Sequence, residues 1–230
     1  MRFPWKKVGF YPLLLVAPAL VFAQHSVVPD NLKAPPRPVY SSKQEEAMVD
    51  VSKVCKTIVI ELRYATDRNF TGKQIYPSKA RALLRKSVAA RLVHAQEELH
   101  KQGLGLKIWD AYRPAWAHDI LWQSIPNPEF VASPAYGGSF HTWGVAVDVT
   151  LVDLEGKEQR MASDFDDFTP AAKSEYEGDN SRIAANMKAL RTAMFNAGFK
   201  GMRDEWWHFY AVDSNQFSPV DMPLESGGKY

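Results

Sequence analysis

The sequence predicts an α+β fold: a single domain with a mainly antiparallel sheet flanked by helices. Apolar and β-branched runs of strand length occur at four places, namely 57–64, 104–110, 145–152 and 206–212. Two longer stretches, 78–102 and 181–197, carry apolar residues at helical spacing. Strands and helices do not alternate strictly along the chain, as they would in a parallel α/β fold. The order of the elements therefore favours antiparallel pairing.

In the first half of the domain, the strand at 57–64 is followed by a turn at Asn69–Gly72. The helix at 78–102 has Leu92 and Leu99 on its apolar stripe, and Gly103 ends it. After the strand 104–110, Pro114 suits the first turn of a further helix that ends before Pro126.

In the second half, a loop rich in Pro, Ser and Gly at 126–140 leads to the strand 145–152. A turn follows at 153–156, and we expect the polar, acidic segment 157–180 to pass over a functional site. Ser181 is the expected cap of the last helix, which Gly198 ends. The last strand, 206–212, precedes a Pro-rich tail.

The chain divides into four predicted parts. Residues 1–23 have a basic start, a short apolar run and small residues before a cleavage site after Ala23, which is the pattern of a signal peptide. An uncleaved membrane anchor is the alternative, but the apolar run is short for a span. Residues 24–50 are predicted to form an extended arm, 51–222 the globular domain and 223–230 a tail. Export would place the protein in the periplasm or outside the cell.

Charge and cysteine content limit the possible partners. Removal of residues 1–23 takes away three basic and no acidic groups, so the formal net charge changes from +2 to −1. Nothing then favours nucleic acid or, once the signal is cleaved, stable membrane insertion. The single cysteine, Cys55, excludes an intrachain disulfide. The oligomeric state stays open.

Two short motifs carry the candidate chemistry: His141-x6-Asp148 and Glu205-Trp-Trp-His208. His141 and Asp148 can share one cation only if the chain turns between them, and Gly144 is the obvious place for that turn. Together the motifs offer two imidazoles and a carboxylate as zinc ligands, with one carboxylate left over as a base. A metal-free, packed pair of strands explains the spacing equally well.

A wider set of motifs resembles one metallopeptidase family, the VanX-type D-alanyl-D-alanine dipeptidases. The resemblance rests on Ser-x-His-x-x-Gly-x-Ala-x-Asp at 139–148, Glu-Trp-Trp-His at 205–208, Leu-Arg-Tyr-Ala-Thr at 62–66 and Trp-Asp-Ala-Tyr-Arg-Pro at 109–114. It extends over residues 50–222. It implies the fold of that family, with one zinc ion at the sheet and a small D,D-dipeptide as substrate.

The resemblance also implies a role for eight residues. His141, Asp148 and His208 would bind zinc, Glu205 would be the general base, and Arg113 would stabilise the oxyanion. Contacts to the substrate are implied for Tyr64, Ser139 and Asp166, where a carboxylate pairs with the free ammonium group. The expected reaction is hydrolysis of D-Ala-D-Ala in wall turnover or glycopeptide resistance. A D,D-carboxypeptidase that trims the peptidoglycan stem, or a zinc-binding module without turnover, is the alternative.

Overall fold

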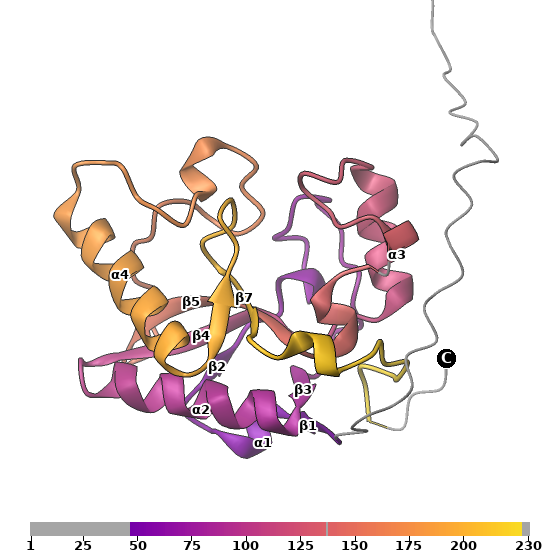
Figure 1. Ribbon diagram of the computed structural model, residues 1–230, viewed down its shortest axis with the longest axis horizontal. Coiled ribbons are helices and arrows are strands. Elements are labelled where there is room, and N and C mark those ends of the chain that lie inside the picture. Colours follow the sequence, from indigo (N-terminus) through magenta and orange to yellow (C-terminus); the bar gives the residue numbers. More distant parts are fainter. Residues whose placement is uncertain (1–46, 137, 227–230) are drawn as a thin grey trace, which may run out of the picture. The chain divides into compact units, whose positions relative to one another are not determined.

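The computed structural model describes residues 47–136 and 138–226, and it confirms the α+β class (Figure 1). Its main sheet has five strands in the order β2-β4-β5-β7-β6. Their bounds are Val59–Ile60 for β2, Leu104–Asp110 for β4, Ala146–Asp153 for β5, Phe199–Gly201 for β6 and His208–Ala211 for β7. β2 pairs with β4 in parallel, and the other three pairings are antiparallel. The sheet is thus mainly antiparallel, as predicted.

A second, two-stranded sheet was not predicted. It pairs β1 (Met48–Asp50) with β3 (Leu83–Arg85) in antiparallel register, and the short helix α1 (Val51–Val54) follows β1. The predicted helix 78–102 is wrong at its start, because α2 spans only Lys86–His100. All three residues of β3 are buried, so the adjacent leucines 83 and 84 are part of a strand buried on both faces and not of a helical stripe.

Two further helices were predicted close to their observed bounds: α3 (Ala115–Ser124) and α4 (Ser181–Asn196). The cap of α4 is Asn180 and not Ser181, because the Asn180 side chain accepts hydrogen bonds from the backbone N–H groups of residues 182 and 183. Helices α2 and α4 pack against each other and against the sheet (Figure 1). No helix in the described part of the chain has the length and apolar character needed to span a membrane.

The predicted strand 57–64 is largely wrong, since β2 contains only Val59–Ile60. The chain leaves the sheet after Glu61, whose N–H still donates to the carbonyl of Ile108. Arg63–Ala65 then form a 3₁₀ turn in which the side chains of Arg63 and Tyr64 are both buried. These two side chains make polar contacts with residues 164 and 166, where the apolar pattern had predicted a continued strand.

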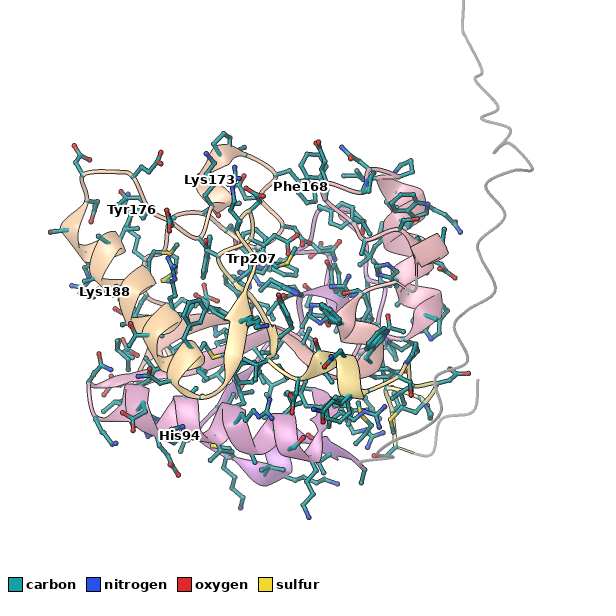
Figure 2. All side chains as sticks on the ribbon, in the orientation of Figure 1. His94, Phe168, Lys173, Tyr176, Lys188 and Trp207 are labelled. Carbon is teal, nitrogen blue, oxygen red and sulfur yellow. The ribbon has the colours of Figure 1, made fainter. Side chains whose placement is uncertain are left out.

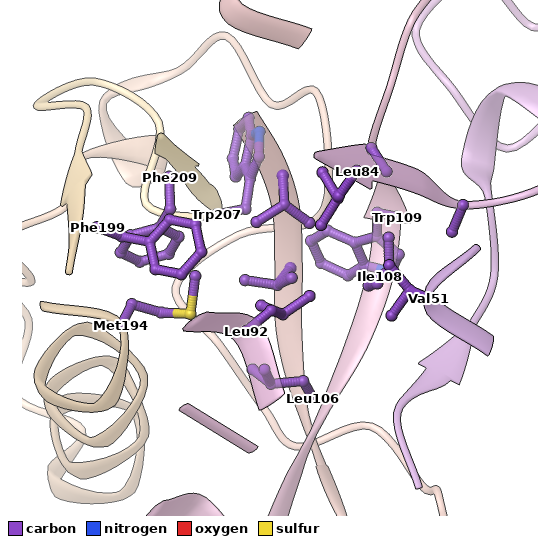
Figure 3. Close-up of a cluster of buried hydrophobic side chains, with 14 of the residues drawn as sticks. Val51, Leu84, Leu92, Leu106, Ile108, Trp109, Met194, Phe199, Trp207 and Phe209 are labelled. Carbon is purple, nitrogen blue, oxygen red and sulfur yellow. The ribbon is translucent and has the colours of Figure 1, made fainter. Parts of the chain in front are cut away.

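Buried apolar side chains fill the space between the main sheet and its helices (Figure 3). Met194 of α4 meets Phe199 and Phe209 there, while Leu92 of α2 lies over Leu106 of β4. This core fixes β4, β5 and β7 relative to one another. The ends of these strands therefore form a rigid platform for a site.

Two parts of the predicted domain organisation stay predictions. The signal peptide at 1–23 and most of the arm at 24–50 lie outside the described residues, although Met48–Asp50 form β1.

At the C-terminal end of the domain, Leu224 is buried and its carbonyl accepts a hydrogen bond from the backbone N–H of Arg81. The first residues after 222 therefore pack on the domain.

Candidate active site

Three ionisable residues stand opposite one another on neighbouring strands of the main sheet. Asp110 of β4 is in register with Asp148 of β5, which is in register with His208 of β7. The register of β4 shifts between Ile108 and Asp110, and this bulge brings Asp110 opposite Asp148. Since residues that face each other across a ladder share one face of the sheet, the three side chains converge.

His141 reaches the same place from the turn that precedes β5. It lies in the 3₁₀ segment Phe140–Trp143, which the side chain of Ser139 caps and Gly144 ends in a left-handed conformation (φ 70°). Gly144 therefore makes the turn that the sequence required between His141 and Asp148. The Nδ1 atom of His141 donates to the carbonyl of Ala111 at 2.6 Å, which leaves Nε2 free as a ligand atom.

His141, Asp148 and His208 form a buried cluster that fits a metal ion. The Nδ1 atom of His208 lies 2.9 Å from Oδ1 of Asp148 and 3.1 Å from Nε2 of His141. The third edge, from His141 Nε2 to Asp148 Oδ1, measures 3.3 Å. Tetrahedral zinc with bonds of about 2.0–2.1 Å places its ligand atoms roughly 3.3 Å apart. Two imidazole nitrogens and one carboxylate oxygen at these separations are a suitable donor set.

The electrostatics of the cluster keep its carboxylate ionised. Burial by itself raises the pKa of Asp148, but the charges and hydrogen bonds of His141 and His208 outweigh burial and hold that pKa well below its ordinary value. The pKa of His208 is raised, because the hydrogen bond to Asp148 and its charge outweigh the effect of burial. A cation bound in this cluster would therefore have the ionised carboxylate of Asp148 as a ligand.

Arg113 lies beside the cluster and is held by Asp110. The Nε atom of Arg113 donates to Oδ2 of Asp110 at 2.9 Å, and a terminal nitrogen lies 2.8 Å from the same oxygen. The other oxygen of Asp110 accepts from the Tyr76 hydroxyl at 2.8 Å. The same Arg113 nitrogen is 3.7 Å from Asp148. Arg113 is therefore a buried guanidinium fixed next to the His141–Asp148–His208 cluster.

Glu205 precedes β7 and is the second carboxylate of the cluster region. Its Oε2 atom lies 3.9 Å from Nδ1 of His208, so it is near the cluster without being one of its three residues. Burial raises the pKa of Glu205 above its ordinary value. A carboxylate with a raised pKa is a stronger base than an exposed one.

Asp166 and Tyr64 form a further polar pair in the same region. The hydroxyl of Tyr64 donates to Asp166 Oδ1 at 3.2 Å, and the backbone N–H of Phe70 approaches Oδ2 at 3.5 Å. Burial raises the pKa of Asp166 well above its ordinary value. A cation placed beside this carboxylate would stabilise its ionised form.

One cavity of about 400 Å³ joins all these groups. Its walls include each of the eight residues to which the resemblance gave a role, that is Tyr64, Arg113, Ser139, His141, Asp148, Asp166, Glu205 and His208. A larger cavity of about 570 Å³ lies beside α4 and contains none of the eight. The chemistry of the lining, and not the volume, therefore identifies the candidate site.

The structure adds residues that the sequence reasoning missed. Asp110 is the partner of Arg113, and its position three residues before that arginine was the available signal. Phe168 packs against Phe70 and Phe130 at ring separations of 5.3 and 4.6 Å, and these three rings form an aromatic wall on the cavity. No sequence spacing joins three such distant loops.

Two of the other histidines have very different surroundings. His118 is buried on the cavity wall, and its Nε2 donates to the carbonyl of Ala132 at 2.7 Å. Figure 2 shows His94 on the helix α2, on the opposite side of the sheet from Phe168, and its side chain is about half exposed. Only His118 is thus added to the surroundings of the site.

A buried His-Asp-His cluster beside a carboxylate and a fixed guanidinium, on the end of an antiparallel sheet, is the arrangement of a metallopeptidase. A family model described as D-Ala-D-Ala dipeptidase, of the M15 peptidases, matches residues 44–223. The chain therefore belongs to this family of metal-dependent dipeptidases.

Individual relatives agree with the family match. A D-alanyl-D-alanine dipeptidase of Escherichia coli K12 is 35% identical over 178 residues, which are 74% of this chain and 91% of the relative. The D-alanyl-D-alanine dipeptidase of Enterococcus faecalis is 31% identical over 66% of this chain and 85% of its own length. One from Streptomyces coelicolor is 31% identical over 65% of this chain and 83% of its own length. The similarity thus covers most of each protein.

Proposed function

We propose that this protein is an exported zinc dipeptidase that hydrolyses D-Ala-D-Ala to two molecules of D-alanine. The observation that carries the proposal is the cavity itself, in which the His141–Asp148–His208 cluster and the half-buried carboxylate of Asp166 face one small space. A set of residues that can hold a metal ion supports hydrolysis, and a half-buried carboxylate that favours a cation supports recognition of a free amino terminus.

Zinc is the proposed metal because the three donors are two imidazoles and one carboxylate, without a thiolate or a larger set of oxygens. When bound, the ion would supply Lewis acidity and a water molecule of lowered pKa. His141, Asp148 and His208 would hold it, and the hydrogen bond from His141 Nδ1 to Ala111 fixes the orientation of one of these rings.

Two side chains of the protein then transfer the proton and stabilise the developing negative charge. Glu205 accepts the proton of the attacking water on a carboxylate oxygen and passes it to the amino group of the departing D-alanine. Arg113 donates to the carbonyl oxygen as negative charge develops there. Since Asp110 already orients the guanidinium, little reorganisation is needed during the reaction.

The ammonium group of the substrate is bound by Asp166 with the help of Tyr64. Ser139 lines the same cavity, which supports a role for it in substrate binding as well. The backbone of Phe70 lies against Asp166, and its ring packs on Phe168, so the aromatic wall stands beside the ammonium position. A long acyl chain at this position would have to displace these rings, which favours a free dipeptide over the peptidoglycan stem.

The test is release of D-alanine from D-Ala-D-Ala by the purified protein, beside N-acetyl-D-Ala-D-Ala. We expect chelator-sensitive release from the free dipeptide only, and a loss of about 10²- to 10⁴-fold in Glu205→Ala. Equal cleavage of the acetylated compound would instead indicate a D,D-carboxypeptidase. A protein that binds zinc and releases nothing would indicate a module without turnover.

Export is supported by the signal-peptide pattern of residues 1–23. Expression of the full chain in a Gram-negative host, followed by N-terminal sequencing of the periplasmic protein, tests this part. A mature protein that begins at Gln24 is the expected result. A protein that stays in the cytoplasm with residues 1–23 intact would contradict it.

A further inference from the structure

Two adjacent residues form hydrogen bonds with the segment that carries Asp166. A terminal nitrogen of Arg63 donates to Oδ1 of Asp164 at 3.0 Å, and the hydroxyl of the next residue, Tyr64, donates to Asp166 at 3.2 Å. Both donors lie in the 3₁₀ turn that replaces the end of the predicted first strand. The segment 164–166 is thus attached to one rigid turn at two points.

The backbone of Asp166 needs such an attachment. Its φ of 56° is in the left-handed region, which is unfavourable for a residue with a side chain and persists where the surroundings enforce it. Just before it, Oδ1 of Asp164 accepts from the N–H of the next residue, Phe165, at 2.7 Å. The same oxygen receives the hydrogen bond from Arg63, so one carboxylate joins this segment to the arginine.

Arg63 is itself buried and held by several contacts. It is 2% exposed, and its guanidinium lies 4.9 Å above the ring of Trp109. Its Nε is 3.4 Å from a carboxylate oxygen of Glu61. The ring of Phe165 also packs on Trp109. An arginine held in this way can define the position of a loop.

An ordinary surface ion pair is the simpler explanation, because the side chain of Asp164 is 72% exposed and such pairs contribute little to stability. That argument concerns stability and not geometry. The pair joins the buried guanidinium of Arg63 to Asp164, and Asp166, two residues further on, is the proposed binding group for the substrate's ammonium. A small contribution of the pair to stability is therefore compatible with a large effect on substrate binding.

We infer that Arg63 and Asp164 are positioning residues that hold Asp166 in place to bind the ammonium group of the substrate. This inference rests on the proposed function, in which Asp166 binds that group. Neither residue touches the reacting atoms. Their loss should therefore weaken recognition of the ammonium group and leave the hydrolytic step nearly unchanged.

The experiment measures two constants for the unaltered protein and for Asp164→Ala, which removes an exposed side chain and should fold normally. The first is KM for D-Ala-D-Ala, and the second is the inhibition constant of propionyl-D-alanine, which lacks the amino group. We expect KM to rise about tenfold with kcat changed less than about twofold, and the inhibition constant to stay the same. Asp164→Asn can still accept from the N–H of Phe165, so its KM should lie between that of the unaltered protein and that of Asp164→Ala.

Asp213→Asn is the matched control, because it breaks another Arg–Asp pair, with Arg91, whose residues do not line the cavity. It should change neither constant. Equal weakening of both ligands by Asp164→Ala, or no effect on either, would overturn the inference while the proposed function stands. An unaltered protein that does not hydrolyse D-Ala-D-Ala would overturn the proposed function, and the inference with it.

Discussion

Asp148 and His208 lie directly opposite each other on β5 and β7, and their side chains are 2.9 Å apart although sixty residues separate them in the chain. Sheet pairing therefore sets the distance between two of the three predicted metal ligands. The third, His141, comes from the turn just before β5 and lies 3.3 Å from Asp148. Most of the geometry of the metal site is thus a property of the sheet register.

Asp148→Asn should reduce metal binding strongly, because the amide keeps the shape of the carboxylate and removes its charge. We expect the affinity for zinc to fall by more than about 100-fold, since loss of an outer-shell partner alone costs about 10- to 100-fold. Metal content after gel filtration and a calorimetric titration with zinc measure this. His94→Ala, on an exposed histidine of α2, should bind zinc normally. Normal zinc affinity in Asp148→Asn would exclude Asp148 as a ligand.

The eight residues singled out from the sequence line one cavity, whereas several elements of the fold were predicted less well. The strand 104–110 was predicted with its observed bounds, because its alternating apolar residues match a strand between two neighbours. The helix at 78–102 was wrong at its start because residues 83–85 pair with Met48–Asp50, a contact between distant segments that no local pattern encodes. Tertiary pairing there overrides local propensity.

The limits at the site have a similar origin. The three residues that the structure brings together, His141, Asp148 and His208, were singled out because each motif contains two chemical groups at close spacing. Asp110 and the aromatic wall of Phe70, Phe130 and Phe168 were missed, because their importance depends on a bulge in β4 and on three loops that meet in space. Arg63 was hidden for the same reason, since its partner Asp164 lies about a hundred residues away.

Arg113→Lys should lower kcat by about 10²- to 10³-fold without loss of metal. Lysine keeps the positive charge but cannot place two nitrogens on Asp110, as the guanidinium does, and so cannot be oriented in the same way. Steady-state kinetics with D-Ala-D-Ala and metal analysis measure both quantities. Arg91→Lys is the control, because Arg91 makes a two-nitrogen contact with Asp213 and does not line the cavity. A rise in KM alone would show that Arg113 binds the substrate in its ground state.

His118 should make the stability of the metal-free protein depend on pH. Burial, together with the nearby charge of Arg113, lowers its pKa from 6.5 to about 4. Between these values the unfolded chain binds more protons than the folded protein, so the free energy of unfolding rises with pH, by about 3 kcal/mol at most. In His118→Gln, which can still donate to the carbonyl of Ala132, this increment should vanish. Urea unfolding with chelator at pH 4.5, 5.5 and 7 tests it; parallel curves for the two proteins would contradict the prediction.

Gly144→Ala should impair both folding and the metal site, because Gly144 is the turn between His141 and Asp148. Its φ of 70° disfavours any side chain, and an added Cβ would lie 2.6 Å from the end of the Met48 side chain. Left-handed backbone costs an alanine about 1–2 kcal/mol, so thermal or urea unfolding should show a loss of at least that size. Gly103→Ala separates the two effects, since φ there is 72° and no heavy atom lies within 4 Å of the added Cβ. It should lose a similar free energy of unfolding and keep full zinc affinity, whereas Gly144→Ala should lose zinc affinity as well. Equal zinc affinity in the two variants would mean that His141 is placed by the hydrogen bond to Ala111 and not by this turn.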